Sequence, residues 1–423
     1  MTSVLLGCSS NAGVPPDDGG TEPTVDVGPQ GDAAEIETGV DANPLLPIGP
    51  VDLGFGAETQ MALADNRLVV AWIGAGPISY ALSTDRGATF PYVSQIALTR
   101  LGDPIAAAAP DGSIFVGGIG LCSNTCVGRL VVALSAKGAT SFEPPAVLNS
   151  PYFIDHPWLT AATDGRLTLV YNSRSLTGNP PAFDGSAMQA STSTTGQGWE
   201  TNDIVPLDGQ RSMSIPTSSV AGTVSYALFY DSASLSQTTL EKSADGKVWS
   251  PTAPLPGRFG AYSGQAIRSA SRDSDVWLLY GVAQTGSAES TAFVYPQGLA
   301  IVHSSDEGAD WQEGVVVIND GRLYMEPELV VERTGALDVA YYAGARELDP
   351  DGAIEWMRST DAGASWSTPV VLQGGIRFQT SRTTADWLGD YVAVVTDDDF
   401  AYFAWTSNET GTARAKFARR TLR

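Results

Sequence analysis

Apolar residues occur in short runs along most of the chain, and polar turn residues bound each run. Examples are LVVAWI (68–73), IFVGGI (114–119) and LTLVY (167–171), each preceded by a turn such as ADN, PDG or TDG. Runs of this length, rich in Val, Ile, Tyr and Trp and separated by Gly, Asp and Pro, are typical of strands joined by tight turns. The pattern therefore predicts an all-β protein.

The turn-plus-strand pattern recurs seven times, beginning near residues 65, 111, 164, 221, 273, 334 and 397. One complete unit contains four strands in sequence, which we label a to d: DPIAAAAP, SIFVGGI, GRLVVALS and PPAVLN. Four antiparallel strands in about 50 residues is the size of one blade of a β-propeller. Radial packing of such blades would bury both faces of these apolar sheets.

A second repeat lies between strands c and d. The stretches HSSDEGADW (303–311) and RSTDAGASW (358–366) share Ser-x-Asp-x-Gly-x-x-Trp, STDRGATF (83–90) matches, and SADGKVW (243–249) matches with one residue deleted. Two degenerate copies have Lys137 and Thr194 in the Asp place, so the copies are 51 to 61 residues apart. This regularity indicates a structural unit rather than scattered catalytic carboxylates.

The repeated motif suits a tight turn. We expect the Asp to accept hydrogen bonds from backbone N–H groups, the Gly to supply a positive φ, and the aromatic residue to pack between sheets. The residues given these structural roles are Asp85, Asp245, Asp306, Asp361, Trp249, Trp311 and Trp366.

The last unit has only three strands, DYVAVVT, FAYFAWT and ARAKFAR. The N-terminal stretch PLLPIGPVDLG (44–54) resembles the fourth strands of the other units, so it can complete the last blade and close the ring. We predict a single propeller domain over residues 46–423 with seven blades; the alternative has six blades, with the last unit packed on the side.

The first 45 residues have a different composition. Leu5-Leu6-Gly7-Cys8 resembles a bacterial lipobox, and Ser9 by analogy favours the outer membrane. Residues 9–45 carry eight carboxylates and no Lys or Arg, which predicts a disordered tether. We therefore predict a lipobox remnant (1–8), lipidation at Cys8, and a cell-envelope location, either in the outer membrane or extracellular, with the membrane reached only through the lipid anchor.

Charge and cysteine content narrow the possible partners. The formal net charge of −23 argues against nucleic acid and anionic lipid surfaces. Cys122 and Cys126 can close a small disulfide loop or remain reduced thiols. The sequence predicts no metal or cofactor, because the two His residues are far apart and the acidic run 397–399 lacks calcium-ligand spacing.

The Ser-x-Asp-x-Gly-x-x-Trp copies resemble the Asp-box (BNR) repeats of sialidases and other secreted β-propellers. WLGDYVAV (387–394) also resembles the closing unit of bacterial sialidase-like propellers. The resemblance implies that the boxes lie away from the ligand face. Sialidases use three Arg, an Asp acid/base and a Tyr–Glu nucleophile pair, but their Phe/Tyr-Arg-Ile-Pro motif has no counterpart here.

The opposite face, formed by the d–a and b–c connections, is where we expect a glycan or protein ligand. Arginines recur at its d–a connections, and the b–c loops 172–190, 281–298 and 343–356 could wall it. The predicted ligand-binding residues are Arg211, Arg258, Arg322, Arg377, Arg382, Tyr262, Asp386 and Trp158, and the weaker catalytic candidates are Tyr324, Glu326 and Asp155.

Guanidinium groups pair bidentately with carboxylates, so such a cluster could bind an acidic sugar. Each Arg could instead pair with one of the chain's many carboxylates. We predict a monomeric, non-catalytic glycan- or protein-binding propeller; the alternative is a sialidase-type glycoside hydrolase acting on acidic sugars, and a purely structural lipoprotein is a third hypothesis.

Overall fold

A computed structural model describes residues 47–96, 101–120, 127–177, 182–209, 213–232, 234, 238–256, 267–282, 295–346, 349–378 and 385–422. The chain divides into two compact units, residues 1–42 and 43–423, and all described residues belong to the second. The predicted lipobox, tether and Cys8 lie outside the described residues, as do Cys122 and Cys126.

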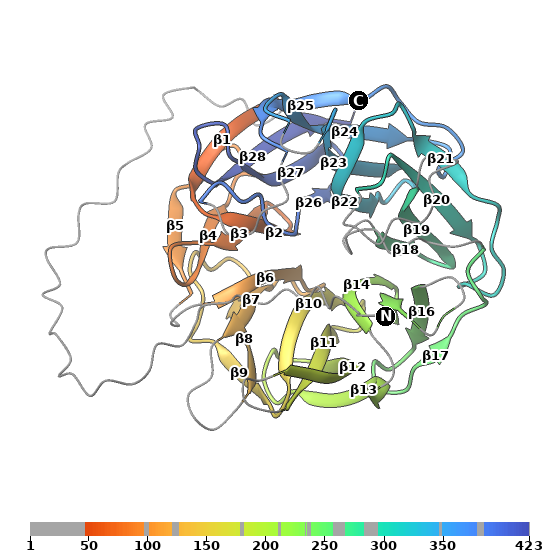
Figure 1. Cartoon of the computed structure of the whole chain (residues 1–423). Coiled ribbons are helices and arrows are strands. Elements are labelled where there is room, and N and C mark those ends of the chain that lie inside the picture. Colours follow the sequence, from red (N-terminus) through yellow and green to blue (C-terminus); the bar gives the residue numbers. More distant parts are fainter. Residues whose placement is uncertain are drawn as a thin grey trace, which may run out of the picture. The chain divides into compact units, whose positions relative to one another are not determined.

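Strands in the described residues form seven four-stranded antiparallel sheets, which we number as blades 1 to 7 (Figure 1). Blade 1 contains β2 (Ala57–Ala64), β3 (Arg67–Ile73), β4 (Ile78–Ser83) and β5 (Tyr92–Gln95). Blade 2 contains β6 (Leu101–Ala108), β7 (Ile114–Gly120), β8 (Gly128–Ser135) and β9 (Ala146–Ser150). Blade 3 contains β10 (Phe153–Ala161), β11 (Leu167–Thr177), β12 (Ala182–Ser193) and β13 (Glu200–Asp208).

The later blades repeat this order. Blade 4 contains β14 (Met213–Ala221), β15 (Val224–Asp231), β16 (Thr238–Ser243) and β17 (Ser250–Pro251). Blade 5 contains β18 (Ile267–Arg272), β19 (Asp275–Val282), β20 (Gly298–Ser304) and β21 (Val315–Ile318). Blade 6 contains β22 (Leu323–Val331), β23 (Leu337–Gly344), β24 (Gly352–Ser359) and β25 (Val370–Ile376).

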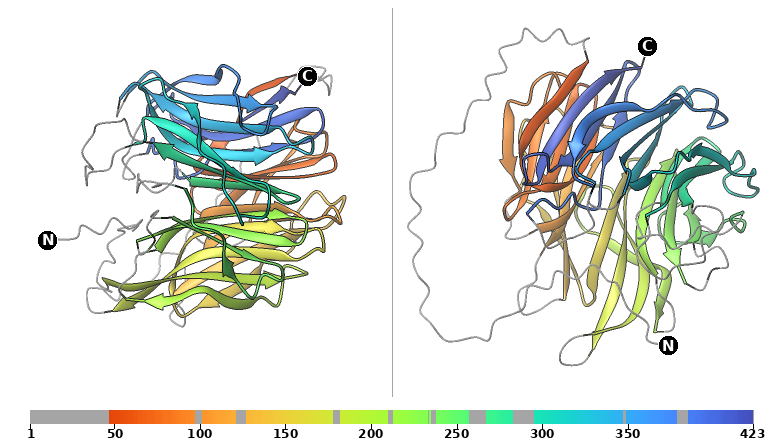
Figure 2. Two further views of the ribbon diagram at one scale, coloured as in Figure 1. Left: turned by 90° about the vertical axis from the view of Figure 1, so that its right-hand side faces the viewer. Right: turned by 45° about the horizontal axis from the view of Figure 1, so that its top comes forward.

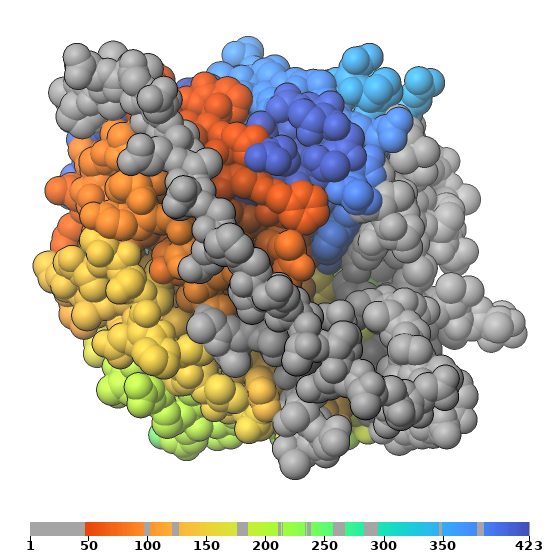
Figure 3. Space-filling model, turned by 90° about the vertical axis from the view of Figure 1, so that its left-hand side faces the viewer, coloured from red at the N-terminus to blue at the C-terminus, as the bar shows by residue number. Residues whose placement is uncertain are grey.

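Blade 7 is built from both ends of the propeller. Its strands β26 (Ala393–Thr396), β27 (Phe400–Ser407) and β28 (Arg414–Thr421) are completed by β1 (Ile48–Phe55), which pairs with β28. Figure 3 shows the two segments in contact at the surface, orange-red against blue. This confirms the prediction of seven blades closed by an N-terminal strand, and it excludes the six-bladed alternative.

The core lies between the blades. Each of seven buried clusters joins two neighbouring blades; for example, one cluster packs Val69 of blade 1 against Val116 of blade 2. An aromatic residue from a c–d turn reaches six of these clusters: Phe90, Phe142, Trp199, Trp249, Trp311 and Trp366. The sheets stand side by side around an axis when viewed from further directions (Figure 2).

The c–d turns are held by their Asp side chains. Asp85 Oδ1 accepts a hydrogen bond from the Thr89 backbone N–H at 2.9 Å, and Asp361 Oδ1 accepts one from Ser365 at 2.9 Å. Gly87 and Gly363 have positive φ values of 73° and 94°. Hydrogen bonding keeps the pKa of Asp361 below its usual range, and in Asp85 it outweighs the opposing effect of burial.

One degenerate copy of the turn motif is shifted by one residue from the sequence alignment. In blade 3 Ser193 pairs with Leu167, and in blade 4 Ser243 pairs with Ser225, so the two serines occupy equivalent positions. Residues 193–196 therefore form the same short turn as residues 243–246, which are Ser, Ala, Asp and Gly. Thr195 therefore occupies the Asp position, and its Oγ1 accepts a hydrogen bond from Gln197 N–H at 3.3 Å. The assignment of Thr194 to that position was wrong.

Candidate functional site

The site begins at irregularities in the inner strands. Antiparallel pairing is interrupted by a bulge near the start of five of them, β2, β6, β10, β14 and β22. At each bulge a non-glycine residue has a left-handed φ between 43° and 56°: Glu58, Asp103, His156, Ile215 and Glu326. Such backbone strain is often retained at functional sites, and bulges re-aim side chains there.

These bulges lie at the end of the propeller away from the c–d turns. Each bulged inner strand runs from its bulge towards the a–b turn. The a–b turns lie beside the c–d turns: in blade 1, the N–H of Arg86 in the c–d turn donates to the carbonyl of Asn66 in the a–b turn at 2.9 Å. The bulged ends therefore belong to the face on which the sequence analysis placed a ligand. We call this end of the channel the mouth; its titratable residues are Glu58, Asp103, Asp155, His156, Glu326, Asp390 and Tyr391.

A histidine–tyrosine pair lies at the centre of the mouth. His156 Nδ1 and the Tyr391 hydroxyl are 2.9 Å apart, and both residues are buried. The segment bearing Tyr391 approaches β2 closely because position 389 is Gly: a Cβ there would lie 2.5 Å from Glu58 Cγ. Burial and the surrounding carboxylates, beginning with Asp103, raise the pKa of Tyr391 well above its ordinary value, so the phenol stays protonated.

Asp103 is joined to this pair through the His156 backbone. Its Oδ2 accepts a hydrogen bond from the His156 backbone N–H at 3.0 Å, and its side chain is half-buried. Burial, together with the carboxylates of Asp155 and Asp390, raises the pKa of Asp103 to about 6, against the opposing effect of His156. A carboxyl group with this pKa can take up or release a proton near neutral pH.

Asp155 lies near the Nε2 edge of the imidazole. Its Oδ2 forms an ion pair with Arg174 at 3.2 Å, and its Oδ1 is 4.0 Å from His156 Nε2. The ring therefore has a carboxylate near Nε2 and the Tyr391 hydroxyl at Nδ1.

Arg268 and Trp158 form the adjoining part of the mouth. Buried Arg268 pairs with Glu328 at 2.9 Å and lies 3.9 Å from Glu326. Its guanidinium carbon is 5.4 Å from the Trp158 ring centre, and the Trp158 and Tyr391 ring centres are 5.9 Å apart. Burial raises the pKa of Glu328 to about 7, although Arg268 opposes this.

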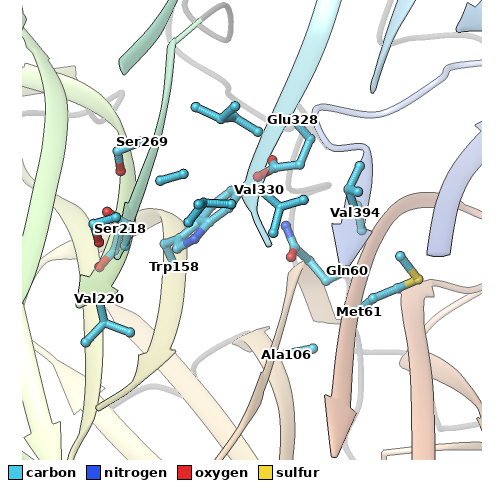
Figure 4. Close-up of a pocket in the computed structure, with 16 residues that line it drawn as sticks. Gln60, Met61, Ala106, Trp158, Ser218, Val220, Ser269, Glu328, Val330 and Val394 are labelled. Atoms are coloured by element: carbon cyan, nitrogen blue, oxygen red, sulfur yellow. The ribbon is translucent and has the colours of Figure 1, made fainter. Parts of the chain in front are cut away.

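A cavity of about 250 Å³ lies on the axis next to these residues (Figure 4). Residues of all seven inner strands line it, which shows that it is the central channel. Trp158 and Glu328 belong both to its wall and to the mouth, so the channel and the mouth adjoin.

Arg322 and Tyr324 have partners within their own blade. Arg322 makes two bonds to the Glu355 carboxylate, at 2.6 and 2.9 Å, and one to Asp320 at 2.8 Å. The Tyr324 hydroxyl donates to Asp320 Oδ1 at 2.6 Å, so its one proton is not directed to Glu326. The carboxylate of Glu326 is instead one cause of the raised pKa of Tyr342.

The other predicted residues divide into two groups. Arg377, which is exposed, lies 3.5 Å from Asp386, so the structure brings these two predicted ligand-binding residues together. Trp158 and Asp155 lie at the mouth as described above. The remaining predicted residues are outside the described ranges: Arg211, Arg258, Tyr262 and Arg382.

The predicted b–c loop at 172–190 is mostly strand. β11 and β12 pair as far as Thr177 and Ala182, so the segment is an extended hairpin rather than a loop. Asn172 to Ser175 are four polar residues in a row and Gly178 to Pro181 are turn formers, which made the segment look like a loop in the sequence.

Sequence reasoning missed His156, Tyr391, Asp103 and Glu58 as site residues. A signal was present: four of the five strained residues stand directly before a proline, and three of these four are polar. The four pairs are Asp103-Pro104, His156-Pro157, Ile215-Pro216 and Glu326-Pro327. A polar residue repeatedly placed before Pro at the same point of a repeat marks the bulge.

Within the described ranges, no group of three or more His, Cys, Asp or Glu side chains has an arrangement suited to a metal ion. The run Asp397–Asp399 instead pairs with Arg86 and Arg333. None of the described residues forms a helix of the length and apolarity that a membrane crossing requires.

No family model matches the chain, and no curated protein matches it. Solved structures do. A PL25 ulvan lyase bound to -[GlcA(1-4)Rha3S]- matches with 12% identity and a TM-score of 0.54, covering 89% of this chain and 98% of the lyase. A Hadza microbial sialidase matches with 13% identity and a TM-score of 0.49, covering 88% of this chain and 68% of the sialidase. A Penicillium chrysogenum α-L-arabinanase has 12% identity and a TM-score of 0.49 over 89% and 99%. At these identities the likeness concerns the propeller fold.

Proposed function

We propose that the protein is a glycan-binding propeller whose ligand occupies the mouth. The observation that carries this proposal is the convergence of His156, Tyr391 and Asp103 from separate blades beside the Trp158 ring. Aromatic faces next to hydrogen-bonding groups suit the apolar and hydroxyl-bearing sides of a sugar. The lyase that shares the fold is described as bound to an oligosaccharide, which agrees with this class of ligand.

Charge at the mouth favours a neutral glycan over the acidic sugar considered from the sequence. The described residues place six carboxylates and two guanidinium groups there: Glu58, Asp103, Asp155, Glu326, Glu328 and Asp390 with Arg174 and Arg268. Both guanidinium groups already face carboxylates. A ligand carboxylate would therefore meet an excess of negative charge.

Binding can be tested with a glycan array followed by calorimetry on the neutral oligosaccharides that bind. Trp158→Ala should weaken binding at least tenfold, since one aromatic platform contributes more than about 1.4 kcal/mol. Arg333→Ala is the matched control, because Arg333 pairs with Asp398 at the a–b turns on the opposite face. Binding that is unchanged in Trp158→Ala, or binding of acidic glycans alone, would contradict the proposal.

General acid–base cleavage of the bound glycan is the second candidate function. The half-buried carboxyl group of Asp103, with a pKa of about 6, favours it. In this role Asp103 would donate its proton to the glycosidic oxygen as the bond to the anomeric carbon breaks. Water would add to that carbon, and the proton that it loses would return to Asp103, which the His156 backbone N–H holds in place. This site differs from the Tyr324/Glu326 pair considered first for a hydrolase.

Cleavage can be measured as new reducing ends released from every glycan that binds. Turnover that falls at least about a hundredfold in Asp103→Asn, with the Kd preserved, would support the enzyme. Binding without any turnover by the wild-type protein would leave the non-catalytic module as the function.

We further propose that the protein acts as a monomeric envelope lipoprotein anchored through Cys8. The support is the lipobox-like LLGC and the acidic stretch 9–45 that follows it. Metabolic labelling with a fatty acid should mark the wild-type protein but not Cys8→Ala, and fractionation should move that variant from membranes to the soluble fraction. Equal labelling of both proteins would reject the anchor.

A further inference from the structure

The central channel contains a second set of converging polar groups. Gln60 from β2, Trp158 from β10 and Glu328 from β22 all line the cavity, and Figure 4 shows their polar ends directed towards its middle. Gln60 and Trp158 are both partly exposed, so the amide and the indole N–H can be reached by a ligand in the cavity. An amide, an indole N–H and a carboxyl group supply both donors and acceptors.

The backbone adds to this polarity. Every inner strand pairs with one other strand only in the described sheets, so its second edge faces the channel. Such edges carry unpaired N–H and C=O groups that need water or a ligand. In the wall, the buried hydroxyls of Ser219, Ser269 and Ser271 have no partner among the described residues, and a hydroxyl can rotate to meet a new one.

Size and charge define the class of ligand. Pockets for drug-sized ligands are about 300–1,000 Å³ in volume. At about 250 Å³ the channel cavity lies just below that range, which suits a single sugar ring rather than an oligosaccharide. The charge of Glu328 is offset by Arg268 at 2.9 Å, so the wall carries no surplus charge for an ionic ligand. The Trp158 ring provides an apolar face.

We propose that the central channel binds a small, neutral, polyhydroxylated molecule of monosaccharide size. The site goes beyond the glycan bound at the mouth, because its wall consists of inner-strand residues below the bulges. A ligand that contacts several inner strands would also hold the blades together. Because it binds only the closed ring, it should raise the melting temperature, and the added stability should grow with the ligand concentration c as RT ln(1 + c/Kd).

The full-length protein can be titrated with glucose, galactose and myo-inositol by ligand-observed NMR and calorimetry, with glucuronate as the charged counterpart. We expect saturable binding of at least one neutral probe, a matching rise in Tm, and no binding of glucuronate. Gln60→Leu should weaken binding about tenfold through loss of its hydrogen bonds. Gln95→Leu is the matched control, since Gln95 is exposed on the outer strand β5.

Ala106→Leu provides a second, independent variant, because it adds bulk to the cavity wall without removing a polar group. It should abolish binding while the unliganded protein stays folded, as checked by its thermal transition. Asp103→Asn should retain monosaccharide binding, because Asp103 does not line the channel. If the wild-type protein binds a monosaccharide but no oligosaccharide, only the proposed function at the mouth is refuted. If no neutral probe binds, or if binding survives both Gln60→Leu and Ala106→Leu, the channel holds water only and the inference is wrong.

Discussion

His156 Nδ1 and the Tyr391 hydroxyl lie 2.9 Å apart although 235 residues separate them in the chain. His156 follows Asp155 at the bulge of β10 in blade 3, whereas Tyr391 immediately precedes the inner strand of blade 7. The pair therefore crosses the axis of the propeller. It joins blades that are not neighbours, and it exists only when the ring is closed.

Tyr391→Phe should lower the free energy of unfolding by about 1–3 kcal/mol, because it leaves a buried ring nitrogen without its partner. Equilibrium denaturation at neutral pH measures this. Tyr342→Phe is a matched control: its hydroxyl is equally buried and donates to the Thr406 carbonyl at 2.8 Å. Both variants should lose stability, but only Tyr391→Phe should weaken glycan binding at the mouth; equal effects on binding would argue against a role for the pair.

Asp338→Asn should change how stability depends on pH. Burial, with a contribution from Glu332, raises the pKa of Asp338 to about 8 in the folded protein. The folded protein holds the proton on Asp338 more tightly than the unfolded chain, in which the carboxyl pKa is near 4. The resulting stabilisation is complete below about pH 4 and is lost as the pH rises through about 8. The wild-type protein should therefore lose about 1 kcal/mol relative to Asp338→Asn between about pH 7 and 9.

The amide in Asp338→Asn can still accept the Trp356 indole bond, which is 2.7 Å long in the wild-type protein. Urea denaturation across this pH range measures the difference. Asp398→Asn, in an exposed pair with Arg333, should leave the pH slope unchanged. A parallel pH dependence of wild type and Asp338→Asn would contradict the assignment of the raised pKa.

Thr195→Asp should stabilise the propeller by about 0.5–1 kcal/mol. The carboxylate would occupy the place that Asp245 has in blade 4, where Oδ1 accepts the N–H groups of Lys247 at 2.8 Å and Val248 at 2.9 Å. Thr194→Asp is the matched control, because it adds the same charge one residue earlier in the same exposed turn. Its carboxylate would not be placed to accept those bonds, so stability should change by less than about 0.5 kcal/mol. If thermal unfolding ranks the two variants in the opposite order, the one-residue correction of this turn is wrong.

The fold could be predicted because the blades repeat the same local signals. A polar turn and an apolar strand recur in all seven units, the Ser-x-Asp-x-Gly turn or a degenerate copy recurs in six, and PLLPIGPVDLG could be recognised as the missing fourth strand of the last. The error at Thr194 arose because deletion of one residue leaves two alignments that look equally good. Only the pairing of Ser193 with Leu167 distinguishes them.

The site was less predictable because its members come from different blades. The sequence indicated the face on which the bulged strand ends lie, but Glu58, Asp103 and Tyr391 come together through ring closure and not through a shared local motif. Arg322 looked like a ligand-binding residue because it recurs in the d–a connections. Its bidentate pairing with Glu355 depends on a neighbouring strand 33 residues away, which no local spacing reveals.

Leu53→Ala should destabilise the whole propeller, although Leu53 lies at its N-terminal edge. Leu53 belongs to β1 and is 4% exposed, packed in the cluster that joins blade 7 to blade 1. Loss of a buried leucine side chain costs about 2–5 kcal/mol. Phe55→Ala on the same strand is the control: Phe55 is 50% exposed, and only its backbone carbonyl bonds to Trp72, so the loss of stability should be small.

Hydrogen exchange should show faster opening of β28 together with the rest of the ring in Leu53→Ala. The contradicting result would be faster exchange in β28 alone, with no change in global unfolding. In that case the ring would be stable without β1, and closure by the N-terminal strand would not stabilise the fold.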